Sequence, residues 1–78
     1  MKEFVEYVAK SLVDNPDRVE VQVTESNGEV ELVLLVDEDD MGKVIGRDGR
    51  IAKAIRNLLR VMATRDGRHV ELEIESHE

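Results

Sequence analysis

The sequence predicts an α+β domain in which helices cover one face of a three-stranded sheet. Three observations support this fold class. Three segments alternate apolar and polar residues as strands do, two others repeat apolar residues at helical spacing, and a pair of glycines precedes the longest helical segment. The predicted order of elements is α-β-β-α-α-β. With 78 residues the chain has room for one domain, which we expect to span residues 1–78.

A first helix is predicted from Lys2 to Val13, because its apolar residues fall on one helical face: Phe4, Val5, Val8, Ala9 and Leu12. Asn15-Pro16 ends this helix, since the residue before a proline is driven out of the α region. Tyr7 and Phe4 are the only aromatic side chains in the chain. We interpret both as packing residues in preference to platforms for stacked bases.

Two strands follow and are predicted to form an antiparallel hairpin. The segment Arg18–Thr24 alternates valines with polar residues, as a half-buried strand does. Ser26-Asn27-Gly28 is a turn signal, because Asn and Gly readily adopt positive φ. The segment Val30–Val36 is almost continuously apolar, which favours a central position in the sheet.

Four consecutive acids, Asp37 to Asp40, then precede a short helix, Met41–Ile45, that stops at Gly46. We interpret Asp37 as the N-cap of this helical segment and the following acids as partners of its dipole. A metal site is the weaker interpretation, because neither His nor Cys joins the run and the spacing of a calcium loop is absent. We expect no metal and no other cofactor.

The longest helix is predicted over Arg50–Thr64. One face is apolar and consists of Ile51, Ile55, Leu58, Leu59 and Met62. The opposite face consists of Lys53, Arg56, Asn57 and Arg60. Ala54 and Val61 lie at the border of the apolar stripe. A loop over Arg65–Arg68 leads into a final strand, His69–Glu75, with alternating apolar and acidic residues.

Charge is unevenly distributed along the chain, whose formal net charge is −7. Eight basic residues and two acids lie between Met41 and Arg68, whereas the remainder holds three bases and 16 acids. Such segregation is typical of a local electrostatic footprint for a polyanion. No cysteine and no apolar run of membrane-spanning length are present, so we expect no disulfide, no membrane segment and a cytoplasmic location. Because no Ser or Cys nucleophile is placed beside a His, we expect no enzyme.

The glycine pair Gly46-Arg47-Asp48-Gly49 joins the two helices of the basic segment. Glycine lets another molecule's backbone approach closely, and the helix behind the loop offers unpaired N–H groups and the positive end of its dipole. Together with Arg47, Arg50 and Lys53, this arrangement suits a phosphate backbone.

The wider pattern, Gly42-x-x-Ile45-Gly46-x-x-Gly49-x-Ile51, resembles the GxxG signature of KH domains, which bind single-stranded RNA or DNA. The element order is similar to that of the type II KH fold over the whole chain, in particular to the stand-alone single-KH proteins of bacteria, the KhpA type. The resemblance implies that the loop grips the backbone of short single-stranded RNA, in post-transcriptional regulation or as an RNA chaperone. It also implies a homodimer and a larger KH-containing partner of the Jag type. The site residues it implies are Gly42, Lys43, Ile45, Gly46, Arg47, Asp48, Gly49, Arg50, Ile51 and Lys53.

Asp48 departs from many family loops, because a carboxylate at the loop tip repels phosphate. We interpret it as a cap that accepts a backbone N–H of the following helix, and we expect weak, sequence-tolerant RNA binding. The alternative function is that of a dimerisation or adaptor protein. In that case Val61 and Ala54 extend the apolar face of the main helix into a partner surface, unless they fill the domain's own core.

Overall fold

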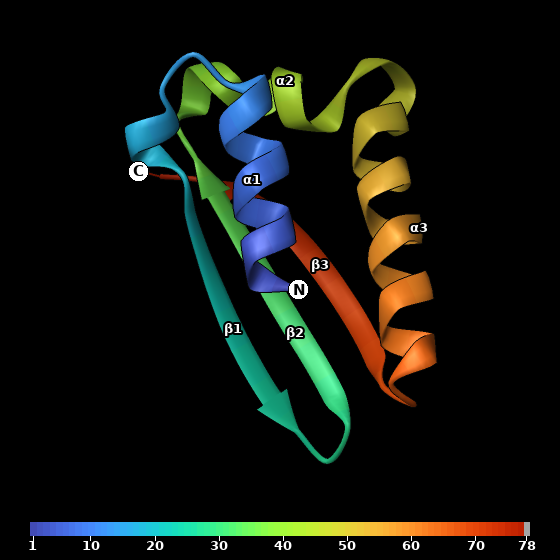
Figure 1. Cartoon of the computed structure of the whole chain (residues 1–78). Helices are drawn as coiled ribbons and strands as arrows, with labels where there is room; N and C mark the ends of the chain where they lie inside the picture. Colours follow the sequence, from blue (N-terminus) through green and yellow to red (C-terminus); the bar gives the residue numbers. More distant parts are fainter. Residues whose placement is uncertain (78) are drawn as a thin grey trace.

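The computed structural model describes residues 1–77, so the last residue of the expected domain, Glu78, lies outside the described part. The main elements are α1 (Lys2–Leu12), β1 (Glu20–Ser26), β2 (Glu29–Val36), α2 (Met41–Ile45), α3 (Arg50–Arg65) and β3 (His69–Ser76). Short 3₁₀ turns, η1 (Pro16–Arg18), η2 (Glu38–Asp40) and η3 (Arg47–Gly49), precede β1, α2 and α3 respectively. The predicted order α-β-β-α-α-β is confirmed (Figure 1).

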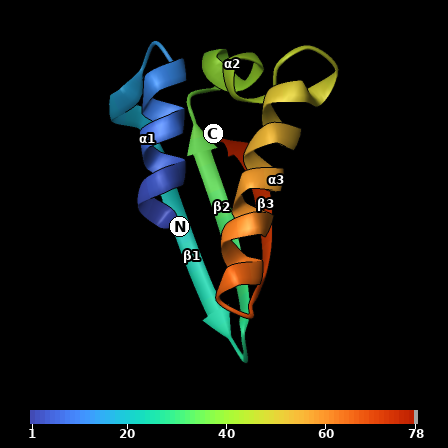
Figure 2. The same ribbon diagram turned by 45° about the vertical axis from the view of Figure 1, so that its right-hand side comes forward.

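The sheet has the order β1-β2-β3 and is mixed. β1 and β2 form the predicted antiparallel hairpin, in which Val23 pairs with Leu32, and β3 lies parallel to β2 with Leu72 beside Leu32. A parallel neighbour requires a crossover, which α2, the glycine loop and α3 supply. Helices α1 and α3 lie on the same face of the sheet (Figures 1 and 2). This is the α+β architecture of a type II KH domain, as predicted.

The core lies between this face of the sheet and the helices. Alternate residues of β2 point into it and are buried: Val30, Leu32, Leu34 and Val36. Val5 and Ala9 of α1, Val44 of α2, and Ile55 and Leu59 of α3 pack against them. Full burial of one such aliphatic side chain contributes about 1.5–3 kcal/mol. The apolar residues that alternate along the strands and those that recur at helical spacing therefore pack into one shared core.

The buried stripe of α3 differs from the predicted one. Its fully buried residues are Ala52, Ile55, Leu59 and Ala63, whereas Leu58, expected in the core, is 53% exposed. Small alanines at both ends of the stripe let the helix approach the sheet closely, and this rotates Leu58 outward. Val61 is also exposed, at 55%, and so is Ala54. We call Ala54, Leu58 and Val61 the apolar flank of α3.

Candidate functional site

The glycine loop begins where α2 ends, and its shape depends on Gly46. This residue has φ 77° and ψ 175°, a region that side-chain-bearing residues avoid. A Cβ atom on Gly46 would lie 2.6 Å from Cγ1 of Ile51. The contact places Ile51, at the start of α3, directly against the loop. Gly46 thus brings the two helices together at a distance that no other residue permits.

Asp48 and Gly49 complete the turn in left-handed conformations, with φ 55° and 73°. Asp tolerates this region better than most residues, because its short polar side chain hydrogen-bonds locally. The predicted capping role of Asp48 is wrong: the N-cap of α3 is Gly49, and no side chain caps this end. Asp48 instead fits the turn because aspartate tolerates this left-handed conformation. Its carboxylate is exposed; the N–H of Arg50 donates to the carbonyl oxygen of Arg47, and no side chain caps the start of α3.

Three cations surround the loop. Arg47, Arg50 and Lys53 are exposed and form no ion pair within residues 1–77. Lys43, grouped with them in the sequence, is placed differently. Its Nζ lies 3.2 Å from Oδ2 of Asp14 and 3.4 Å from Oδ1 of Asp40. The hydrogen bond and charge of Asp14 raise the pKa of Lys43 above its ordinary value.

The basic residues of α3 continue away from the loop along a groove beside β3, the edge strand. This groove, of about 430 Å³, is lined by Arg56, Leu59 and Arg60 of the helix and by His69, Val70, Glu71 and Leu72 of the strand. Nε of Arg56 donates to the carbonyl oxygen of Leu72 at 3.2 Å, which holds helix and strand edge together. We call Lys53, Arg56 and Arg60 the basic flank of α3. Helical geometry places it on the side of α3 next to the apolar flank, and Arg60 and Val61 line the same hollow together with Asn57, Thr64 and Arg65.

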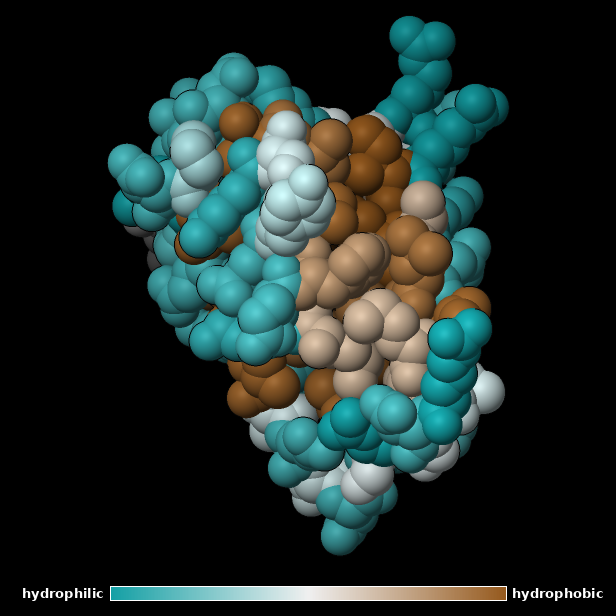
Figure 3. All heavy atoms as spheres, viewed as in Figure 1, coloured by the Kyte–Doolittle hydropathy of each residue, from teal (hydrophilic) through white to brown (hydrophobic). Residues whose placement is uncertain are grey.

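The apolar residues predicted beside the loop lie close to it. Ile45 and Ile51 are half-buried and pack against the core, so each contributes to the fold and to the surface. Gly42 is an exposed helical residue, and a Cβ atom placed on it would meet nothing within 4 Å. The surface of α2 above Gly42 is therefore open. Figure 3 shows a continuous apolar surface over the space between α1 and α3.

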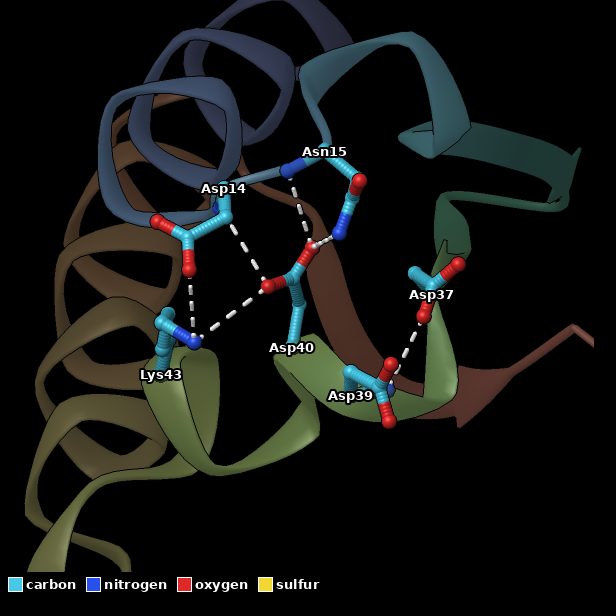
Figure 4. A network of polar contacts seen from close by, with 6 residues as sticks. All are labelled: Asp14, Asn15, Asp37, Asp39, Asp40 and Lys43. Atoms are coloured by element: carbon cyan, nitrogen blue, oxygen red, sulfur yellow. Dashed lines mark hydrogen bonds and ion pairs between the residues drawn. The ribbon is translucent and has the colours of Figure 1, made fainter.

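A polar network that the sequence did not reveal lies at the start of α2 (Figure 4). Asp40, predicted as a dipole partner, is fully buried. Its carboxylate accepts the backbone N–H groups of Asp14 and Asn15 at 3.2 and 3.1 Å, and Nδ2 of Asn15 at 3.0 Å. Burial alone would raise the pKa of Asp40, but these bonds and Lys43 hold that pKa below its ordinary value. Asp37 accepts the N–H of Asp39 at 3.0 Å and so caps the 3₁₀ turn η2, whereas the N-cap of α2 is Asp40, which makes no side-chain cap bond.

Six of the 18 acidic residues lie behind the sheet. On the face turned away from the helices, the strands expose six glutamates: Glu20, Glu29, Glu31, Glu71, Glu73 and Glu75. The basic residues lie at the loop and along α3, on the other side of the molecule. The charge segregation read along the sequence thus becomes a segregation between faces. A polyanion is repelled by one face and attracted to the other.

Residues 1–77 contain neither a candidate metal site nor a candidate membrane-spanning helix. No group of three or more His, Cys, Asp or Glu side chains is arranged to hold a metal ion. None of the helices combines the length and apolar character needed to cross a membrane.

Comparison with known proteins identifies relatives of this chain. The family model described as the KH domain of KhpA/KhpB matches residues 2–74. A protein of Clostridium acetobutylicum named RNA-binding protein KhpA is 51% identical over 95% of this chain and 99% of its own length. Proteins of the same name from Borreliella burgdorferi and Aquifex aeolicus are 49% and 46% identical over 92% and 95% of this chain, and 88% and 94% of their own lengths.

Solved structures show the same fold. Era of Aquifex aeolicus, bound to GDP and AlF₄⁻, superposes with a TM-score of 0.67 at 23% identity, over 97% of this chain and 30% of Era. Era in complex with a nucleotide and a fragment of 16S ribosomal RNA gives a TM-score of 0.60 at 24% identity, over 96% of this chain and 29% of Era. At this identity the likeness concerns the fold alone.

Proposed function

We propose that this chain, which belongs to the KhpA/KhpB KH-domain family, is an RNA-binding protein that grips the backbone of short single-stranded RNA through residues 46–49. It is a binding protein and not an enzyme, and it acts in the cytoplasm in post-transcriptional regulation or as an RNA chaperone. The observation that carries the proposal is the loop itself. A Gly-only conformation at Gly46 adjoins an uncapped helix start and three cations that have no acidic partner within residues 1–77.

Each part of the site has a separate task in this proposal. The backbone N–H groups at the start of α3 and the helix dipole attract phosphate. Arg47, Arg50 and Lys53 add positive charge on exposed side chains, which can adjust their positions to the phosphates. The groove beside β3 accommodates the nucleotides that follow, with Arg56 and Arg60 along one wall. Because this chain has only two aromatic residues, and Tyr7 and Phe4 both lie on α1, base stacking contributes little. The expected binding is weak and tolerant of sequence.

The salt dependence of affinity tests this proposal. A loop of this size engages about two to four phosphates, in keeping with a KH grip on four nucleotides, so log K should fall with log salt at a slope of about −1.5 to −3. The measurement is fluorescence anisotropy of a labelled short RNA across a salt series. The double variant Arg47→Asp, Arg50→Asp should abolish binding while its circular dichroism spectrum stays that of the wild type. Unchanged affinity in the folded double variant would exclude a phosphate grip by this loop.

A second candidate function is self-association, and the apolar flank favours it. Leu58 and Val61 are each more than half exposed, on a helix whose other sides are buried or charged. We propose that a second copy of this chain covers the apolar flank. In a dimer with a two-fold axis, the apolar flanks of the two copies would pack against each other. A small core also gains stability from burial against a partner. A larger KH-containing protein of the Jag type is the heteromeric alternative for the same flank.

A further inference from the structure

Asp40 is the only charged side chain that is fully buried within residues 1–77. Its partners come from two separate parts of the chain. Asp14 and Asn15 lie in the connection that follows α1, whereas Lys43 lies on α2, one turn beyond Asp40. Every buried side-chain nitrogen or oxygen in this region is hydrogen-bonded. The carboxylate therefore ties the connection after α1 to the start of α2.

This tie matters for the loop because α2 is so short. A helix of five residues cannot form without tertiary support, so contacts at its two ends determine its orientation. Val44, fully buried, anchors its inner side, and Asp40 anchors its start. The N–H of Gly46 donates to the carbonyl of Gly42 at 2.9 Å, so the loop continues directly from the last turn of α2. A shift of α2 at Asp40 would therefore move Gly46 against Ile51.

Lys43 has a different environment from the other cations of the site. It lies between two carboxylates, those of Asp14 and Asp40, whereas Arg50 and Lys53 have no acidic partner within the described residues. Although Lys43 is partly exposed, a phosphate would have to compete with both carboxylates for its ammonium group. The charge of Lys43 is already balanced by these two carboxylates.

We propose that Asp40 is a positioning residue for the Gly46–Gly49 loop and that Lys43 is its counter-ion instead of a phosphate contact. The inference rests on the proposed RNA binding, but one of its consequences needs no RNA. If Asp40 positions the loop, its replacement changes the environment of the loop amides in the free protein. RNA contact by Lys43 and positioning by Asp40 can then be tested separately.

The role of Lys43 is tested by matched neutral variants. Arg50→Met removes an exposed loop cation and should make the salt slope of RNA binding shallower by about 0.7, the value for one phosphate contact. Lys43→Met should leave the slope at the wild-type value and lower the melting temperature. A slope change in Lys43→Met equal to that of Arg50→Met would overturn the counter-ion role.

The role of Asp40 is tested by Asp40→Asn, with Val30→Ala as a control of similar stability. Val30 is buried at the hairpin end of β2, the end of the sheet far from the loop (Figure 1). Asp40→Asn should shift the amide resonances of Gly46 and Gly49 without RNA. It should also weaken RNA binding by about tenfold, or 1.4 kcal/mol, at an unchanged salt slope. Val30→Ala should do neither.

Asn15→Ala serves if Asp40→Asn does not fold, because it removes one donor and leaves both backbone donors in place. It should move the same two amide resonances in the same direction. Unshifted loop amides in a folded variant, or an affinity loss equal to that of Val30→Ala, would overturn the proposal. Failure of the wild type to bind RNA would instead contradict the proposed function, while the resonance shifts would still report on positioning.

Discussion

The two flanks of α3 differ in chemistry although they lie on adjacent sides of one helix. Of the basic flank, Lys53, Arg56 and Arg60, the last two residues line the groove beside β3. The apolar flank, Ala54, Leu58 and Val61, is exposed on the adjacent side of the helix. RNA binding and protein binding, which appear as alternatives in the sequence, therefore have two adjacent surfaces, which meet where Arg60 and Val61 line one hollow. Both can operate in one molecule, and pairing two weak RNA modules raises their combined affinity.

The largest effect is expected from breaking the apolar flank. Leu58→Asp together with Val61→Asp would place carboxylates in an apolar contact, where unpaired charge costs several kcal/mol. We expect self-association to weaken by more than about 100-fold, measured by sedimentation equilibrium. The affinity for an RNA long enough for one domain should be unchanged, whereas binding to an RNA with two sites should lose its avidity. A wild type that stays monomeric at high micromolar concentration would end this proposal.

The reciprocal change reverses charge on the basic flank. Lys53→Glu together with Arg60→Glu leaves Arg56, which bonds to β3, in place. Losing two charge-assisted contacts and adding repulsion should weaken RNA binding on the order of 100-fold at low salt. Self-association should persist in the same sample. If both flanks' variants impaired both activities equally, the separation of surfaces would be wrong.

A smaller effect should define how closely RNA approaches α2. Gly42→Ala introduces a methyl group into open space, and alanine in a helix is more stable than glycine by about 0.5–1 kcal/mol. The melting temperature should therefore rise. If the RNA backbone lies against α2, affinity should fall by about tenfold through steric exclusion. A more stable variant with full affinity would restrict the RNA site to the loop and the basic flank.

Much of this arrangement was predictable because its signals are local. The hairpin turn, the loop between α2 and α3 and the order of elements each depend on residues near one another in sequence, and these structural predictions are confirmed. The register of α3 was less accessible. Periodicity emphasised the large Leu58, but close packing selected the small Ala52 and Ala63. The Asp40 network was out of reach, since its partners Asp14 and Asn15 are 26 and 25 residues away. In the sequence, Asp40 is one of four equivalent acids.

The smallest effect is expected at Asp48, the one acid at the tip of the loop. The basic flank of α3 follows this loop in the chain. Its carboxylate is exposed and its backbone is left-handed, with φ 55°. Asp48→Asn removes the charge but keeps a residue that tolerates this conformation. Affinity for short RNA should therefore increase about threefold, the effect of removing one screened repulsion, with the melting temperature unchanged.

Asp48→Lys is the matched variant, because it reverses the charge but tolerates positive φ poorly. It should bind RNA more tightly than Asp48→Asn and melt at a lower temperature, the backbone strain costing on the order of 1 kcal/mol. Gel-shift titration and thermal denaturation of both variants separate charge from conformation. Weaker binding by a fully folded Asp48→Asn would show that the carboxylate organises the loop for its ligand. In that case the negative charge at the loop tip would not weaken RNA binding by repelling phosphate.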